Sequence, residues 1–266
     1  MRDRQAVWRW LGRVPFADTA REQERLRDEL LRGAAPETLL LCEHDPVVTL
    51  GRSANPAHVL APRAELARRG VTLATASRGG DVTYHGPGQL VGYPIVRLRG
   101  GVIGHVTAMA RAIASVLAEL GIDARWRRDA PGVWVGDANS ERGAKICAFG
   151  VHVHRRVAIH GFALNVAARL ADDGDGFGLI VPCGLRGTRT TSIGAVLGAG
   201  RAAPPLHVLA SRVAGALGRE LGVGFVPQIE SPATPWEGLA LPAIGSARQS
   251  RATPDATTGH RRDLDR

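Results

Sequence analysis

The sequence has few cysteines and no long apolar run, and both absences exclude classes of protein. Its three cysteines, Cys42, Cys147 and Cys183, are too few and too scattered for a disulfide framework. They suit a reducing compartment, so we expect a cytoplasmic protein. No apolar run approaches the ~20 residues of a membrane span, and residues 1–4 lack the apolar core of a secretory signal. We therefore expect no membrane segment and no leader.

Lysine is almost missing as well. Of the 34 Lys and Arg residues, only Lys145 is a lysine. Arg stays protonated in proteins, whereas a buried Lys can lose its proton and act as a base. The presence of one lysine among so many arginines indicates a task that a guanidinium cannot perform. The alternative is that this lysine was retained by chance in a composition biased toward Arg.

The net charge of +9 predicts attraction to acidic partners. Nucleic acid is disfavoured, because no basic run carries interleaved aromatics and no helix-turn-helix or zinc-finger spacing is present. An acidic protein is the better candidate. The heavy use of Ala, Arg, Gly and Pro explains much of the basicity without any partner.

Periodicity predicts an α+β domain with a mixed β-sheet flanked by helices, over residues 1–228. From 229 onward the chain is rich in Pro, Ser, Thr, Ala and Arg, so 229–266 is expected to be a disordered tail. The expected helices are 17–32, 104–120 and 205–221, and the expected strands are 6–16, 38–42, 47–50, 122–128, 132–136 and the hairpin 145–153/157–166.

The segment 78–89 (RGGDVTYHGPGQ) is the densest chemical signal. Four glycines among residues 78–88 allow the backbone to approach a ligand closely. We expect Tyr84 and His85, inside such a loop, to face a ligand and not the core. A tight turn with incidental polar side chains is the alternative. Phosphate binding is a competitor, but the string matches neither a P-loop nor a dinucleotide fingerprint.

Two further segments carry nucleophile and base candidates. If 145–153 is a strand, Lys145, Cys147 and Phe149 share one face, and desolvation at the strand's edge favours the neutral amine of Lys145. A lysine that extends its amine into solvent is the alternative. Pro182 and Gly184 place Cys183 in a rigid, uncrowded turn, so we prefer it as nucleophile. Cys147 is its rival, since it shares the face of Lys145.

His152, His154 and His160 suggest a metal cluster, because alternate residues of a strand point the same way. No Cys or carboxylate at ligand spacing joins them, so we expect no metal and assign His160 to a pocket wall.

Three strings, in this order, resemble the lipoyl(octanoyl) transferase family: RGGDVTYHGPGQLVGYPI, AKICAFGVHVHRRVAIHGFALNV and VPCGL. With the upstream EHDPVVTLGRSANPAHVL they cover roughly residues 40–195. The resemblance implies the catalytic fold of biotin and lipoate protein ligases, around an acyl tunnel. It implies transfer of octanoyl from octanoyl-acyl carrier protein to lipoyl domains of 2-oxoacid dehydrogenases and glycine cleavage H protein. This is the first step of protein lipoylation, and it uses no cofactor.

The resemblance also implies residue roles. Cys183 is the acyl-accepting nucleophile and Lys145 its activator. Phe149 stands where the family more usually has an aliphatic residue, which affects chain-length preference, and the stretch 172–177 is longer than is typical. The implied substrate-binding residues are Arg78, Gly79, Gly80, Asp81, Val82, Thr83, Tyr84, His85, Ala148, Phe149, Gly150, Gly161, Phe162 and Ala163.

Two other functions remain open at this point. An ATP-dependent lipoate or biotin ligase on the same fold needs an adenylate loop and has no use for Cys183. A non-catalytic module that binds carrier protein uses only the basic surface. A requirement for ATP identifies the first, and the absence of an acyl-enzyme identifies the second.

Overall fold

The computed structural model describes residues 5–136, 143–170, 176–184 and 187–228. The expected tail, 229–266, lies outside these described residues, as does most of the stretch 172–177. The helices are α1 (Phe16–Arg32), α2 (Arg63–Arg68), α3 (Val102–Glu119), α4 (Ile193–Leu197) and α5 (Leu206–Leu221). The strands are β1 (Gln5–Val14), β2 (Thr38–His44), β3 (Val47–Leu50), β4 (Thr72–Thr75), β5 (Val82–His85), β6 (Gln89–Arg97), β7 (Ala124–Arg127), β8 (Gly132–Val135), β9 (Ala144–His154), β10 (Val157–Asn165), β11 (Arg189–Thr190) and β12 (Gly224–Pro227).

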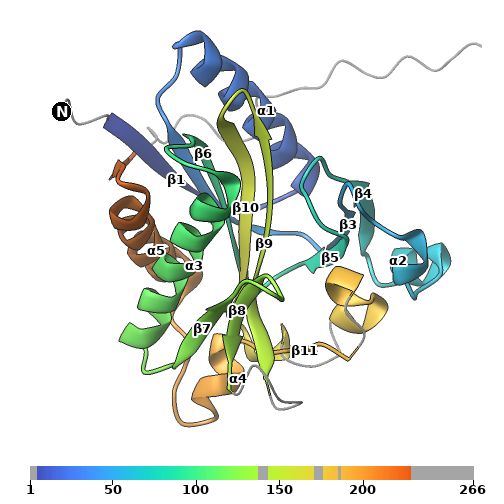
Figure 1. Cartoon of the computed structure of the whole chain (residues 1–266). Helices are drawn as coiled ribbons and strands as arrows, with labels where there is room; N and C mark the ends of the chain where they lie inside the picture. The colour runs from blue at the N-terminus through green and yellow to red at the C-terminus, as the bar shows by residue number, and fades with distance from the viewer. Residues whose placement is uncertain (1–4, 137–142, 171–175, 185–186, 229–266) are drawn as a thin grey trace, which may run out of the picture. The chain divides into compact units, whose positions relative to one another are not determined.

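The main sheet of the described chain is mixed, which confirms the predicted fold class (Figure 1). Its order is β12-β1-β2-β6-β10-β9-β8-β7, with β11 paired to β9. β1 runs parallel to β2 and β12, whereas β6, β10, β9, β8 and β7 are antiparallel neighbours. The predicted hairpin is β9–β10. Both of its turn residues, Arg155 and Arg156, have positive φ, the conformation that a two-residue hairpin turn requires.

Helices α3 and α5 pack against each other and cover one face of this sheet (Figure 1). Their apolar side chains, such as Ile113 and Val213, meet Leu39 and Leu41 of β2 in the principal core. By length and composition alone, α3 also qualifies as a membrane span. Its buried stripe, including Met109, Ile113 and Leu117, packs within this core, so its apolar character is that of a core helix.

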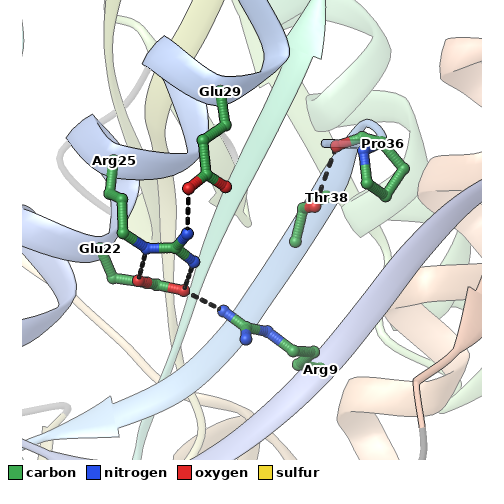
Figure 2. A network of polar contacts seen from close by, with 6 residues as sticks. All are labelled: Arg9, Glu22, Arg25, Glu29, Pro36 and Thr38. Atoms are coloured by element: carbon green, nitrogen blue, oxygen red, sulfur yellow. Dashed lines mark hydrogen bonds and ion pairs between the residues drawn. The ribbon is translucent and has the colours of Figure 1, made fainter. Parts of the chain in front are cut away.

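Helix α1 covers the opposite face and contacts β6 and β10. An ion network ties it to the sheet, as Figure 2 shows. Glu22 accepts hydrogen bonds from Arg9 of β1 at 2.5 Å and from Arg25 at 2.8 and 2.9 Å. Burial by itself would raise the pKa of Glu22, but the bonds from Arg25 and Arg9 outweigh it and hold that pKa below its ordinary value of 4.5.

Replacing Glu22 with Gln should lower the free energy of unfolding by about 1–3 kcal/mol at neutral pH, because charge-assisted hydrogen bonds are lost. Since the folded pKa of Glu22 is depressed, its contribution is complete above about 4.5 and is lost as pH falls through the folded pKa. Urea unfolding of both proteins from neutral to acid pH should show the gap closing. Glu29→Gln, which removes one bond to the exposed Arg25, is the control and should cost under ~1 kcal/mol. Equal losses in the two variants would contradict this assignment.

A second, small sheet of order β4-β3-β5 adjoins the main one. It packs with α2 and the segment 177–180 around its own apolar cluster, which contains Val48, Leu66 and Val82. Residues 58–61 pair with residues 179–181 through Leu60 N to Leu179 O (2.9 Å) and Val181 N to His58 O (2.7 Å). Apolar packing against the small sheet and hydrogen bonds with residues 58–61 thus hold the segment that leads to Cys183.

Candidate active site

A cavity of about 260 Å³ opens between the hairpin β9–β10, strand β6 and the segment 78–85. Every substrate-binding residue expected from the sequence lines it, with the exception of Tyr84. Lys145 and Cys183 line it as well, and so does His160. The complete lining is Phe16, Arg78, Gly79, Gly80, Asp81, Val82, Thr83, His85, Val91, Tyr93, Asp129, Ala130, Pro131, Lys145, Ala148, Phe149, Gly150, His160, Gly161, Phe162, Ala163 and Cys183.

Cys183 lies in a short turn, Pro182–Gly184, and is partly exposed to the cavity. Its φ of 55° and that of Gly184, 69°, are both left-handed. Left-handed backbone is uncommon for a residue with a Cβ and persists where the surrounding structure enforces it. Here Gly184 N donates to Val181 O at 3.1 Å, and Val181 is tied to His58. The turn therefore presents the sulfur in one defined direction.

Lys145 reaches the same sulfur from the start of β9. Its Nζ lies 3.7 Å from Sγ of Cys183, and the residue is only 5% exposed. The same Nζ also lies 5.0 Å from the ring centroid of Trp134, on the neighbouring strand β8. A Cβ at Gly132 would meet Cε of Lys145 at 2.9 Å, so that glycine provides room for the lysine. Two groups 38 residues apart in the sequence thus form one thiol–amine pair.

The other two cysteines have different environments. Cys42 and Cys147 are buried in the sheet, and burial raises the pKa of both thiols well above the ordinary value. Of the three β9 residues expected on one face, Lys145 and Phe149 line the cavity, whereas Cys147 belongs to the principal core and lines only a small adjacent cavity of about 20 Å³. A β-bulge opposite Val133 and Trp134 interrupts the ladder at this point, which breaks the simple alternation assumed from the sequence.

Arg78 is a buried cation at the cavity wall. Its guanidinium donates to the carbonyl and hydroxyl of Thr49 and to the carbonyls of Gly79 and Asp81. Within the described ranges no carboxylate forms an ion pair with it. Burial lowers the pKa of Arg78, and attraction to Cys183, Tyr93 and Asp81 opposes that shift; a guanidinium nevertheless stays protonated. Arg78 therefore places a fixed positive charge near the Cys183 sulfur.

The expectation that Tyr84 and His85 avoid the core was wrong for Tyr84, which belongs to the apolar cluster of the small sheet. Both are buried, in strand β5, at 3% and 6% exposure. Tyr84 packs edge-on against Phe177, with ring centroids 5.8 Å apart, on the side away from the cavity. His85 does line the cavity and bonds to Gln89. Residues 82–85 form strand β5 and pair with β3, although the sequence predicted a loop here. Successive side chains of this strand therefore point to opposite faces of the small sheet.

Sequence reasoning missed Tyr93, His44 and Ser77, whose polar groups form hydrogen bonds beside the cavity. Tyr93 bonds to His44 Nε2 at 2.7 Å, and Ser77 bonds to His160 Nε2 at 2.9 Å. Burial lowers the pKa of His44 to about 4 and of His85 and His160 to about 3, so these rings are neutral at neutral pH. The strand string LVGYPIV carries Tyr93 at an inward position, but nothing in the sequence places it opposite β2.

No group of three His, Cys, Asp or Glu side chains suited to a metal ion occurs in the parts of the chain that are described. His160 turns inward with a φ of 59° and is 4% exposed, whereas His154 is exposed at the hairpin tip.

Comparisons with known family models and relatives agree on one family. Residues 16–211 match the family described as lipoyl protein ligase A/B catalytic domain. The chain is 44% identical over 201 residues to the octanoyltransferase of Myxococcus xanthus, covering 74% of this chain and 55% of that protein. It is 45% identical to the octanoyltransferase of Koribacter versatilis (71% and 74% covered) and 41% identical to that of Chloroflexus aurantiacus (84% and 96% covered).

Solved structures show the same fold. A bipartite lipoate protein ligase from Thermoplasma acidophilum superposes with a TM-score of 0.62 at 16% identity, covering 86% of this chain and 88% of that one. A lipoate-protein ligase A bound with ATP gives 0.63 at 14% identity, covering 86% and 90%. At such identities the likeness concerns the fold alone.

Proposed function

The chain belongs to the octanoyltransferases of the lipoyl protein ligase A/B catalytic-domain family, and from this premise we propose that Cys183 carries the octanoyl group as a thioester between donor and acceptor. The donor in this proposal is octanoyl-acyl carrier protein. The acceptor is a lysine of a lipoyl domain of 2-oxoacid dehydrogenases or of glycine cleavage H protein. The reaction takes place in the cytoplasm.

The observation that carries the proposal is the 3.7 Å contact between Nζ of Lys145 and Sγ of Cys183 at the wall of the cavity. A thiol attacks as its thiolate, so it needs a base or a nearby positive charge. Lys145 supplies both in turn: its neutral amine takes the thiol proton, and the resulting ammonium stabilises the sulfur anion. The fixed charge of Arg78 favours the same anion.

The first half-reaction follows from these positions. The Cys183 thiolate attacks the donor thioester carbonyl, the new C–S bond forms, and the bond to the carrier's phosphopantetheine sulfur breaks. Lys145 returns its proton to that leaving sulfur. One thioester replaces another of similar energy, so the step needs no ATP and no cofactor.

The cavity supplies the acyl site. Its lining includes the apolar residues Val91, Phe149, Phe162 and Ala163, which suit an alkyl chain. Phe149 is itself held edge-on against Trp126, with ring centroids 5.6 Å apart. A rigid aromatic ring at this position restricts the width of the site, so we expect Phe149 to affect which chain lengths are accepted.

The net charge of +9 supports an acidic donor protein.

Arg78 affects the reaction through its positive charge and not through an N–H group that is free to bond the substrate. Its guanidinium bonds are already used by Thr49, Gly79 and Asp81.

Intact-mass analysis after incubation with octanoyl-carrier protein tests the proposal. We expect one octanoyl adduct that is labile to hydroxylamine and maps to Cys183, formed without ATP. An adduct on Cys147 would contradict the assignment of the nucleophile. An absolute requirement for ATP would instead identify an adenylating ligase of the kind that shares this fold.

A further inference from the structure

A histidine–carboxylate pair adjoins the nucleophile's turn on residues that the dyad does not use. Nδ1 of His58 hydrogen bonds to the carboxylate of Asp81. The same carboxylate accepts from the backbone N–H of Asn55 at 2.9 Å. The two side chains are 19% and 13% exposed, and Asp81 lines the cavity together with Cys183. The pair is therefore held by hydrogen bonds and is still reached by solvent.

The pair touches the turn that carries Cys183. A Cβ at Gly184 would lie 2.5 Å from Oδ2 of Asp81 and 3.1 Å from Cε1 of His58. Backbone contacts fix the same relation, because Val181 N donates to His58 O at 2.7 Å. The imidazole of His58 consequently lies beside Gly184, the residue that follows Cys183 in the turn.

The hydrogen bond to Asp81 orients the His58 ring so that its other nitrogen can accept a proton. A hydrogen bond to a carboxylate places the ring proton on Nδ1 and leaves a lone pair on Nε2. Among the described residues, Nε2 of His58 makes no hydrogen bond. The preceding residues Asn55, Pro56 and Ala57 are exposed, so a proton accepted by Nε2 can pass to water.

In the second half-reaction the acceptor lysine attacks the Cys183 thioester, and this step requires a base near Cys183. A lysine side chain in solution is an ammonium, with a pKa near ~10.4, and an ammonium has no lone pair with which to attack. Lys145 by itself cannot remove both protons that the acceptor nitrogen must lose. During the attack, Lys145 takes a proton from the attacking nitrogen and passes it to the departing Cys183 sulfur. Lys145 therefore ends this step with the same number of protons as it began, and it is only 5% exposed. One further proton must leave the acceptor for solvent.

We propose that His58, oriented by Asp81, forms the acceptor-amine site and deprotonates the incoming lysine ammonium, an inference that rests on the proposed Cys183 thioester. Nε2 takes one proton from the ammonium and releases it to water. The freed amine forms a C–N bond to the thioester carbon, and the C–S bond to Cys183 breaks. Lys145 carries the second proton from the nitrogen to the sulfur. The products are the amide, the free thiol and one proton in solution.

The test separates the two half-reactions in the full-length enzyme. His58→Asn keeps an N–H near the position of Nδ1, and hence the bond to Asp81, but removes the base. The rate of acyl-enzyme formation from octanoyl-carrier protein should stay within about twofold of wild type. Transfer from the isolated acyl-enzyme to a lipoyl domain should fall about 10²-fold, the usual contribution of a general base.

Hydroxylamine supplies the decisive control, because it is uncharged at neutral pH and needs no deprotonation before attack. Release of octanoyl hydroxamate from the His58→Asn acyl-enzyme should proceed at the wild-type rate. A pair that merely supports the turn would slow acylation, lysine transfer and hydroxylaminolysis together, and that result would overturn the proposal. Transfer to the lipoyl domain at the wild-type rate would overturn it as well.

Asp81→Asn gives an independent variant should His58→Asn fail to fold. It leaves the imidazole in place but removes the charge that selects its tautomer, so lysine transfer should again fall more than hydroxylaminolysis. Wild-type protein that never forms an acyl adduct on Cys183 would refute the proposed function itself. An adduct that forms normally and is transferred normally by both variants would refute only the role of His58.

Discussion

Cys183→Ala should abolish octanoyl transfer, with a fall of at least ~10⁴-fold, the scale seen when a covalent nucleophile is removed from an enzyme. No other thiol can substitute, because Cys42 and Cys147 are buried and their pKa values are raised by that burial. Cys183→Ser should be equally inactive, since a hydroxyl is far harder to ionise than a thiol. Transfer is measured by the mass shift of a lipoyl domain.

The fold of the Cys183→Ala protein should be intact. Cys183 is only partly buried, and alanine tolerates the φ of 55° about as well as cysteine does. The matched control is Cys147→Ala, which deletes a core sulfur. It should lower the thermal midpoint but retain the acyl adduct and transfer. Retained transfer in Cys183→Ala, or an adduct lost only in Cys147→Ala, would reverse the assignment of the two thiols.

Lys145→Arg should lower transfer by about 10³-fold, within the 10²–10⁴ range of general acid–base catalysis. Arg keeps the positive charge beside Cys183 but cannot give up a proton at any accessible pH. The variant should therefore hold the thiolate and yet fail to return a proton to the leaving sulfur. Discontinuous assays with octanoyl-carrier protein measure the loss.

A second measurement distinguishes the charge of Lys145 from its proton transfer. Alkylation of Cys183 by iodoacetamide reports the thiolate alone, and it should persist in Lys145→Arg. In Lys145→Met the charge is absent, so alkylation and transfer should fall together. The long apolar side chain of Met keeps the packing against Trp134. Near wild-type transfer by Lys145→Arg would mean that the lysine contributes only its charge.

Several features of this protein could be predicted from its sequence because they depend on neighbours along the chain. The helical period of residues 104–120 and 205–221 predicted α3 and α5 to within two residues at each end, since each needs one apolar stripe. The alternation on either side of residues 154–156 predicted the hairpin β9–β10. The unique lysine and the Pro-Cys-Gly turn singled out Lys145 and Cys183.

Only the tertiary structure decided how these parts meet. The contact between Lys145 and Cys183 depends on β9 lying between β8 and β10 and on residues 58–61, which hydrogen bond to residues 179–181. Tyr84 and His85 are adjacent in the sequence, and the pairing of β5 with β3 sends one to a core and the other to the cavity. The contact of His58 with Asp81 joins two loops 23 residues apart. Local patterns determine which face of an element is apolar, but contacts between distant elements depend on strand order and register, which no local pattern specifies.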